Sequence, residues 1–233
     1  MKNTLTLEEY QTGQVILIDK PLTWTSFQVV NKVRWLIKQH YGIKKIKVGH
    51  AGTLDPLATG LLILCTGKFT KQIETYQAQH KEYTGTITIG STTPSYDLET
   101  EVDATFDISE ISEAAIFENT KQFTGEIDQR PPIFSALKKE GKRLYEYARA
   151  GETVEIPTRK ITISAFEITS IQMPEVHFRV ACSKGTYIRS LAHDFGQGLD
   201  NGAHLSALRR TKIGDFEVTN AISIEAFETM LKG

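Results

Sequence analysis

Apolar residues recur along this chain with two different spacings, and each spacing predicts a different kind of element. From residue 25 to residue 39 they return every three or four positions, which predicts an amphipathic helix. This helix is expected to start at Thr25 or Ser26 and to end at Gly42, burying Phe27, Val30, Val33 and Ile37. Residues 176–182 instead alternate, which predicts a strand with Val176, Phe178, Val180 and Cys182 on one side and His177 and Arg179 on the other.

Weaker patterns predict the remaining elements. Residues 61–65 form a short apolar run, and strands are expected at 83–90, 133–139 and 160–171. Helices are expected at 69–77, 112–123, 143–150 (closed by Gly151) and 187–195. Because strands neither alternate regularly with helices nor fill the chain, the pattern predicts an α+β fold with a largely antiparallel sheet. No repeat or linker marks a boundary, so residues 1–233 are expected to form a single domain.

Composition narrows the class of protein. Hydrophobic residues make up 40% of the chain and charged residues 24%, which is ordinary for a globular domain. No apolar run approaches the roughly 18 residues that span a bilayer, and the first ten residues lack the apolar stretch of a secretory signal. We therefore expect a cytoplasmic protein without a membrane partner. Cys65 and Cys182 are expected to be buried free thiols, and no metal site is expected because no histidine has a recognised ligand spacing.

Charge is distributed unevenly although the net charge is only −1. Basic residues gather in four places: Lys44, Lys45 and Lys47; Lys68 and Lys71; Lys138, Lys139, Lys142 and Arg143; and Arg209, Arg210 and Lys212. Acidic residues concentrate between residues 97 and 118. This asymmetry is consistent with a basic face that meets phosphates, although any one cluster is equally consistent with solvated surface.

The segment most informative about chemistry is Gly49-His50-Ala51-Gly52-Thr53-Leu54-Asp55-Pro56-Leu57-Ala58-Thr59-Gly60. Its glycines permit unusual backbone angles, and Pro56 disfavours helix at Asp55. The chain is thereby made to present Asp55 on a rigid loop, which suits a nucleophilic or general-base carboxylate. Asp before Pro is also ordinary turn chemistry, so the loop alone leaves both interpretations open.

Three further segments accompany this loop. They are Ile18-Asp19-Lys20-Pro21-Leu22-Thr23-Trp24-Thr25-Ser26, Arg130-Pro131-Pro132-Ile133-Phe134-Ser135-Ala136-Leu137-Lys138 with Gly141-Lys142-Arg143-Leu144-Tyr145, and Cys182-Ser183-Lys184-Gly185-Thr186-Tyr187-Ile188-Arg189-Ser190-Leu191. Read in order, the four segments resemble the bacterial tRNA pseudouridine-55 synthases, the tRNA pseudouridine synthase B family. The resemblance runs from about residue 15 almost to the end. Leu22 and Thr23 depart from it, because a small residue or Gly is more usual there.

The resemblance implies a pseudouridine synthase fold, with a mixed sheet, flanking helices and a central RNA-binding cleft. It implies an isomerase that converts the T-loop uridine at tRNA position 55 to pseudouridine after flipping it out, without a cofactor. Asp55 would be the catalytic carboxylate, and both a nucleophilic and an elimination route stay open. Arg189 would pair with Asp55 and keep it ionised, and Tyr83 would stack on the uracil and assist proton transfer.

The resemblance also implies a set of substrate-binding residues that surround the flipped uridine or the space it leaves: His50, Tyr83, Tyr187, Leu208 and, as a weaker candidate, Lys20. Core packing is the alternative for the apolar and aromatic members. Asp97 is a second weak candidate, since Thr100 replaces the glycine usual after it.

Relatives commonly continue into a C-terminal RNA-binding PUA module, for which residues 213–233 are too few. The expectation is therefore one catalytic domain without that module, acting as a monomer on tRNA without a guide RNA. Two other functions remain open. The chain would serve as a non-catalytic tRNA-binding or tRNA-folding module, or as a nucleoside or glycoside hydrolase with paired carboxylates, Asp55 with Asp19 or Asp97.

Overall fold

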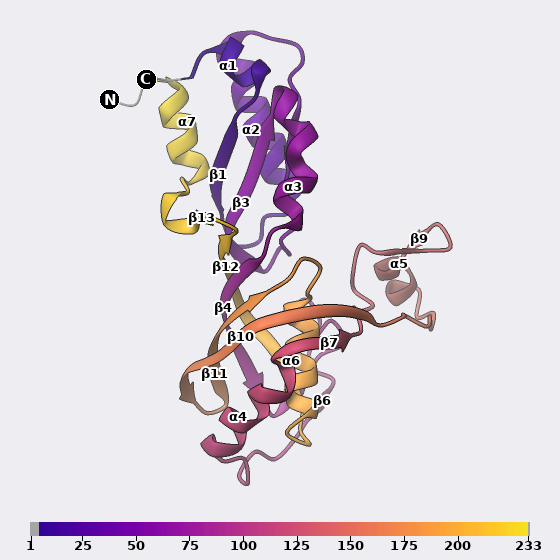
Figure 1. The fold of residues 1–233 in the computed structure, drawn as a ribbon. Coiled ribbons are helices and arrows are strands. Elements are labelled where there is room, and N and C mark those ends of the chain that lie inside the picture. Colours follow the sequence, from indigo (N-terminus) through magenta and orange to yellow (C-terminus); the bar gives the residue numbers. More distant parts are fainter. Residues whose placement is uncertain (1–4, 233) are drawn as a thin grey trace. The chain divides into compact units, whose positions relative to one another are not determined.

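The computed structural model describes residues 5–232. The first four residues and Gly233 belong to the predicted domain 1–233 but lie outside this range. The chain divides into two units (Figure 1). The first unit contains the chain up to Tyr83 and again from Leu208, and the second unit contains Thr84–Ala207. Each unit is described by itself, and the single-domain organisation stays a prediction.

The first unit is built around a long apolar strand. Its elements are α1 (Leu7–Thr12), β1 (Val15–Lys20), α2 (Ser26–Tyr41), β2 (Val48–His50), β3 (Ala58–Thr66), η1 (Gly67–Gln72), α3 (Ile73–Ala78), the start of β4 (Lys81–Ile89), the end of β12 (Ala203–Ile213), β13 (Phe216–Glu217), η3 (Val218–Asn220) and α7 (Ile224–Lys232). Strand β3 pairs antiparallel with β1 and β2 and parallel with β12, which in turn pairs antiparallel with β13. The predicted apolar run 61–65 is the fully buried middle of β3.

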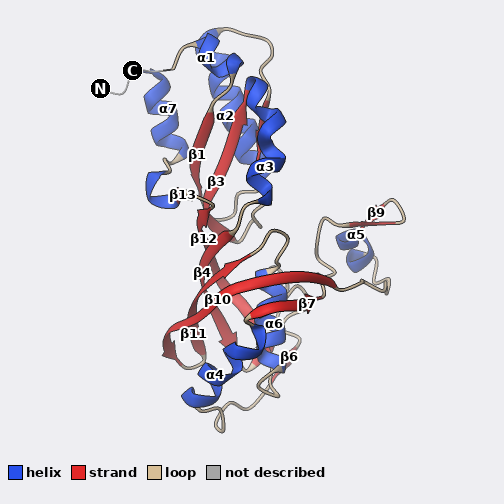
Figure 2. Ribbon diagram, in the orientation of Figure 1, coloured by secondary structure: helices blue, strands red, loops and turns tan. Residues whose placement is uncertain are grey.

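Helices cover both faces of this sheet (Figure 2). Apolar residues of α2 and α7 pack against β1 on one face, and residues of η1 and α3 pack against the alternate side chains of β3 on the other. Helix α2 begins at Thr25, which forms a capping box with Gln28, and ends at Gly42 in the left-handed conformation, so its predicted bounds are confirmed.

The predicted buried face of α2 is correct except at one residue. Val30, Val33 and Ile37 are buried, but Phe27 is 64% exposed. At about 100° per residue, Phe27 points roughly 120° away from Val33, the middle of the buried stripe. Val29 completes that stripe instead.

The second unit also combines a sheet with helices (Figure 2). Its elements are the end of β4, β5 (Ser91–Thr92), β6 (Ala104–Thr105), α4 (Glu113–Asn119), η2 (Thr120–Phe123), β7 (Gly125–Gln129), β8 (Lys138–Lys139), β9 (Lys142–Arg143), α5 (Leu144–Arg149), β10 (Arg159–Gln172), β11 (Glu175–Cys182), α6 (Ile188–Gln197) and the start of β12. Strand β10 pairs antiparallel with β11 and with β7, and β4 lies next to β11. The alternation predicted for β11 is confirmed, since its even-numbered residues from 176 to 182 are buried.

One strand prediction is wrong. Residues 133–137 form bends and loops, and only Lys138–Lys139 are extended, in a short hairpin with β9. The two preceding prolines lack the N–H groups that a sheet ladder requires, and the amide of Ser135 donates to the carbonyl of Ile133 within a tight turn. The strands β1 and β12 and the helix α7 were not predicted.

The remaining fold predictions agree with the structure. The pairs β1–β3, β2–β3, β7–β10, β10–β11 and β12–β13 are antiparallel and β3–β12 is parallel, so the strand pairing is mixed, and the α+β class is confirmed. Cys65 and Cys182 are both buried, and neither forms a disulfide within the described residues. Burial raises the pKa of the Cys65 thiol to about 11, which makes it an inert core residue.

Candidate active site

Asp55 lies in the loop between β2 and β3, in the first unit, and is half-buried. The amide of Ala51 donates to the carbonyl of Ile63, and the amide of Ala58 donates to the carbonyl of Asp55 itself, at 2.9 and 3.1 Å. Gly52 has φ 99°, a conformation that other residues rarely adopt, so the expected role of glycine here is confirmed. The loop is therefore anchored to the sheet on either side of the carboxylate.

The start of α2 holds the residue before Asp55. Ser26 is 2% exposed, and its hydroxyl accepts from the amide of Leu54 at 2.9 Å and donates to the carbonyl of Leu54 at 3.2 Å. The segment resembling the family's first motif thus supports the Asp55 loop directly.

Lys20 belongs to the same support. It is fully buried, and its ammonium donates to the carbonyls of Pro21, Trp24 and Pro56 at 2.9, 2.5 and 3.3 Å. Burial lowers the pKa of Lys20 to about 8, an effect that the negative charge of Asp55 opposes. These contacts favour a role in positioning the loop over direct contact with a substrate.

The other residues predicted to bind substrate in this unit differ from one another in burial and charge. Tyr83 on β4 is 8% exposed, and Leu208 at the start of this unit's part of β12 is half-buried beside Ala58. His50 ends β2; burial, with the positive charge of Arg210 adding to it, lowers its pKa, so the ring is neutral at pH 7. The space-filling role predicted for His50 needs neither an acid nor a base, and it stays a prediction.

The two arginines of the fourth basic group differ. Arg209 forms a forked ion pair with Asp19 at 3.0 and 2.7 Å and is partly exposed. Arg210 is 1% exposed, so the idea that it reaches phosphates is wrong. Asp19, one possible partner of Asp55 in a hydrolase-type carboxylate pair, is thus held by Arg209.

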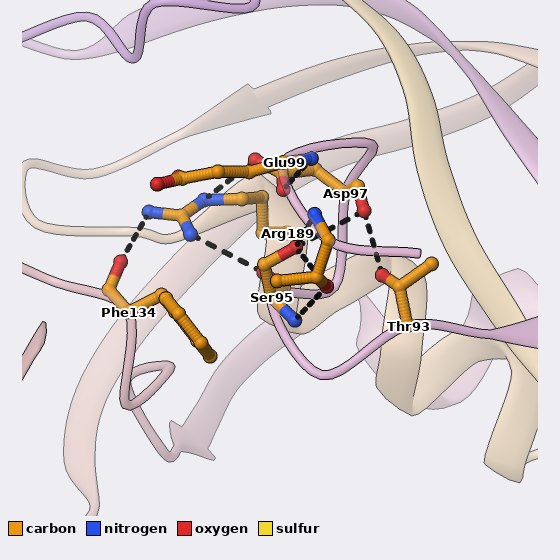
Figure 3. A network of polar contacts seen from close by, with 7 residues as sticks. Thr93, Ser95, Asp97, Glu99, Phe134 and Arg189 are labelled. Carbon is orange, nitrogen blue, oxygen red and sulfur yellow. Dashed lines mark hydrogen bonds and ion pairs between the residues drawn. The ribbon is translucent and has the colours of Figure 1, made fainter. Parts of the chain in front are cut away.

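Arg189 lies in the second unit, in the first turn of α6, and is 4% exposed. Its guanidinium donates to the carbonyl of Ser95 at 3.2 Å and to the carbonyl of Phe134 at 3.0 Å, while its Nε lies 3.6 Å from Oδ2 of Asp97 (Figure 3). Phe134 comes from the third motif segment, so the loop found in place of the predicted strand supplies an acceptor to Arg189.

The turn that carries Asp97 is closed by hydroxyl groups. Thr93 and Ser95 both donate to the carbonyl of Asp97, at 2.6 and 3.1 Å. The Thr100 hydroxyl accepts from the amide of Ser95 at 3.1 Å and lies 2.9 Å from the Ser95 hydroxyl. Thr100, at a position where the resemblance leads one to expect glycine, therefore adds side-chain hydrogen bonds to the turn.

Tyr187 precedes α6 and is fixed through its backbone. The side chain of Gln129 accepts from its amide at 2.8 Å and donates to its carbonyl at 2.9 Å. The guanidinium of Arg159 lies over its ring, 4.6 Å from the centroid. The Tyr187 ring is thus half-buried, and it lies under the Arg159 guanidinium. A guanidinium is a group that binds phosphates in many proteins.

The predicted pairing of Asp55 with Arg189 joins residues of the two units and stays a prediction. Sequence reasoning missed the supports of both residues: Ser26 and Arg210 for the Asp55 loop, and the carbonyls of Ser95 and Phe134 for Arg189. Arg210 belongs to a basic group that the sequence shows, but its burial cannot be read from the sequence. A backbone carbonyl leaves no signal in the sequence.

Two family models together match residues 38–232. The model for the TruB family pseudouridylate synthase N-terminal domain matches residues 38–188, and the model for the tRNA pseudouridylate synthase B C-terminal domain matches residues 189–232. The chain belongs to the TruB family of pseudouridylate synthases. This membership confirms the predicted enzyme class, an isomerase that forms pseudouridine in tRNA.

Relatives in this family match over nearly their whole length. The tRNA pseudouridine synthase B of Flavobacterium johnsoniae is 65% identical over 98% of this chain and 100% of that protein. The protein of the same name from Phocaeicola vulgatus is 51% identical over 95% of this chain and 94% of that protein.

Solved structures share the fold. A Cbf5-Nop10-Gar1 complex matches with a TM-score of 0.69 at 32% identity over 94% of this chain, and an H/ACA RNP bound to a substrate RNA containing 2'-deoxyuridine matches with a TM-score of 0.67 at 30% identity over 95% of it. The chain spans about half the length of those chains, 54% in both cases. The predicted pseudouridine synthase fold is confirmed.

Two kinds of feature are absent from the described residues. No group of three or more His, Cys, Asp or Glu side chains gathers there as a metal site would require. Within residues 5–232, no helix has the length and apolar character to cross a membrane.

Proposed function

We propose that this chain isomerises the T-loop uridine at position 55 of tRNA to pseudouridine, with Asp55 as the catalytic carboxylate. The observation that carries the proposal is the Asp55 loop itself, a family-matching segment whose backbone is anchored to β3, α2 and Lys20 while its half-buried carboxylate follows a glycine-rich turn. Such preorganisation suits a carboxylate that must meet one sugar carbon in one geometry.

In the reaction the N1–C1′ bond of the uridine breaks and a C5–C1′ bond forms, so the atoms of substrate and product are the same. Asp55 either attacks the sugar or removes a sugar proton, and in both routes its charge is needed when the base departs. The proton lost from C5 balances the proton gained at N1. Tyr83, a buried phenol, is the group proposed to assist at C5 and to stack on the uracil.

Arg189 is proposed to pair with Asp55 in the enzyme bound to tRNA. Its burial and its contacts with Ser95, Phe134 and Asp97 fix the direction of the guanidinium in advance. A guanidinium stays charged at any physiological pH and favours the ionised form of a nearby carboxylate.

His50, Tyr187 and Leu208 are proposed to surround the flipped uridine or the space it leaves. Lys20 is proposed as a support of the loop, because its ammonium is buried on three carbonyls. tRNA alone is the proposed partner, without a guide RNA, and the cytoplasm is the proposed location because tRNA is modified there.

The proposal is tested by incubating unmodified tRNA transcript with the wild type and with Asp55→Asn, and mapping pseudouridine at single-nucleotide resolution. Loss of a catalytic carboxylate reduces the rate on the order of 10⁴-fold or more, so only the wild type should modify the T-loop uridine. Asp215→Asn removes an exposed aspartate in the same unit and is the matched control.

Other products identify the other functions. If both proteins bind tRNA and neither modifies it, the chain is a binding module. Release of free uracil would instead indicate a hydrolase. Dependence of the wild type on an added RNA would contradict the proposal that no guide is used.

A further inference from the structure

Arg210 is a buried cation that the reaction, as proposed above, does not use. It lies on β12 in the first unit and is 1% exposed. In the part of the chain that the structure describes, its guanidinium makes no ion pair with a carboxylate. All of its hydrogen bonds go to backbone carbonyls: Nε donates to Leu61 at 2.8 Å, and the two terminal nitrogens donate to Thr53 at 3.4 Å and Gly52 at 3.3 Å.

Close packing of β12 on β3 brings Arg210 to this place. Arg210 is opposite Gly60 in the parallel register of the two strands. Gly60 has φ 104°, and a Cβ there would lie 2.3 Å from the Arg210 carbonyl oxygen and 2.8 Å from its nitrogen. Only glycine allows this close approach of the two strands, so Gly60 makes it possible for Arg210 to pack against the Asp55 loop.

The three acceptors lie on both sides of Asp55. Gly52 and Thr53 come just before it, and Leu61 belongs to the strand that follows it. One planar, rigid guanidinium therefore ties the two flanks of the loop together.

With Arg210 included, every carbonyl from residue 52 to residue 56 has a donor. Arg210 donates to Gly52 and Thr53, Ser26 donates to Leu54, the amide of Ala58 donates to Asp55, and Lys20 donates to Pro56. Loop carbonyls are ordinarily left to water, and a loop whose consecutive carbonyls are held by side chains and by a strand amide has little freedom to reorganise.

We propose that Arg210 is a positioning residue of the active site, which fixes both flanks of the Asp55 loop so that the carboxylate needs no rearrangement when the tRNA is bound. The inference rests on the proposed role of Asp55. Its effect belongs to the chemical step and not to tRNA binding, since Arg210 is buried. The positive charge of Arg210 also contributes to the lowered pKa values of Lys20 and His50, so the guanidinium acts on the surroundings of the loop as well.

The test compares Arg210→Met, which keeps the length but loses every donor, with Arg210→Lys and with Val33→Ala. Val33 is fully buried in the α2 core of the same unit, so Val33→Ala destabilises the unit without touching the loop. Two quantities are measured well below the melting temperature: hydrogen exchange at the amides of Ala51, Leu54 and Ala58, and the single-turnover rate on tRNA with the dissociation constant.

In Arg210→Met the three amides should exchange at least tenfold faster and the single-turnover rate should fall roughly 10- to 100-fold, with the tRNA dissociation constant within about threefold of wild type. Arg210→Lys should give exchange and single-turnover rates between those of wild type and Arg210→Met, because one ammonium cannot reach both flanks of the loop as the forked guanidinium does. Val33→Ala should melt earlier but keep wild-type loop exchange and rate.

Wild-type loop exchange or a wild-type rate in folded Arg210→Met would overturn the proposal. If Arg210→Met does not fold, Arg210→Lys decides: a wild-type rate there would show that the fold needs only a buried cation. The exchange measurement does not depend on activity. A wild-type protein that leaves tRNA unmodified would refute the proposed function, while faster loop exchange in Arg210→Met would still show that Arg210 holds the loop.

Discussion

Each unit contains one arginine buried against backbone carbonyls, and the two arginines are used in opposite ways. Arg210 in the first unit holds a loop that presents another residue, Asp55. Arg189 in the second unit is itself the proposed active-site group, and Asp97 and the carbonyls of Ser95 and Phe134 hold it. Bonds of the same kind, from a guanidinium to backbone carbonyls, thus hold the backbone around the Asp55 carboxylate in the first unit and the Arg189 side chain itself in the second.

The units also differ in how they accommodate a threonine at a position where the resemblance leads one to expect a small residue or glycine. Thr23 in the first unit has φ 68°, a conformation unfavourable for a β-branched residue, and its side chain is exposed. Thr100 in the second unit makes hydrogen bonds with Ser95. One departure strains its turn, whereas the other strengthens it.

The largest effect is expected for Arg189→Lys. Lysine keeps the charge but cannot reproduce the forked geometry, so the single-turnover rate should fall roughly 100-fold or more with the fold intact. Arg179→Lys is the control, because Arg179 forms a forked pair with Glu167 on the surface of the same unit and should leave the rate within about twofold. Near-normal turnover of Arg189→Lys would remove Arg189 from the active site.

A smaller loss is expected for Asp97→Asn. The amide keeps the shape of the side chain and an acceptor for the amide of Glu99, but it loses the charge beside Arg189. Because two carbonyls still hold the guanidinium, the rate should fall about tenfold, the value of one charge-assisted contact. Rates equal to those of Arg189→Lys would mean that Asp97 does more than orient the arginine.

The two threonines should respond to glycine with opposite signs. Thr100→Gly removes the hydroxyl that closes the Ser95 turn and should lower the free energy of unfolding by about 1–2 kcal/mol. Thr23→Gly relieves an unfavourable φ and should raise it by roughly 0.5 kcal/mol, after the added freedom of the unfolded chain is counted. Urea titrations measure both, and changes of the same sign would refute the contrast.

The smallest effect concerns pH and stability in the second unit. Burial raises the pKa of Asp194, the sixth residue after Ile188 in α6, to about 6, although the charge of Arg130 opposes the shift. The folded state therefore binds a proton more tightly than the unfolded state, so this group makes stability fall as pH rises from about 4 to 6. Asp194→Asn should be more stable than wild type at pH 7.5 and equal to it near pH 4, as thermal melts at both pH values would show; a gap that persists at pH 4 would contradict this.

The sequence by itself determined the elements whose cause is local. Thr25, Gln28 and Gly42 set the ends of α2, and alternation set the faces of β11. It also determined the family, because four motifs in order leave little room for coincidence. The rigid loop around Asp55 followed from its glycines and its proline.

Only the tertiary structure decided which groups hold those residues. Arg209 and Arg210 are adjacent and identical in type, yet one forms a partly exposed ion pair and the other is buried, because successive residues of a strand point to opposite faces. The acceptors for Arg189 include the carbonyls of Ser95 and Phe134. Every residue has such a carbonyl, so the identity of a residue does not record which one is used, and only the folded chain brings donor and acceptor together.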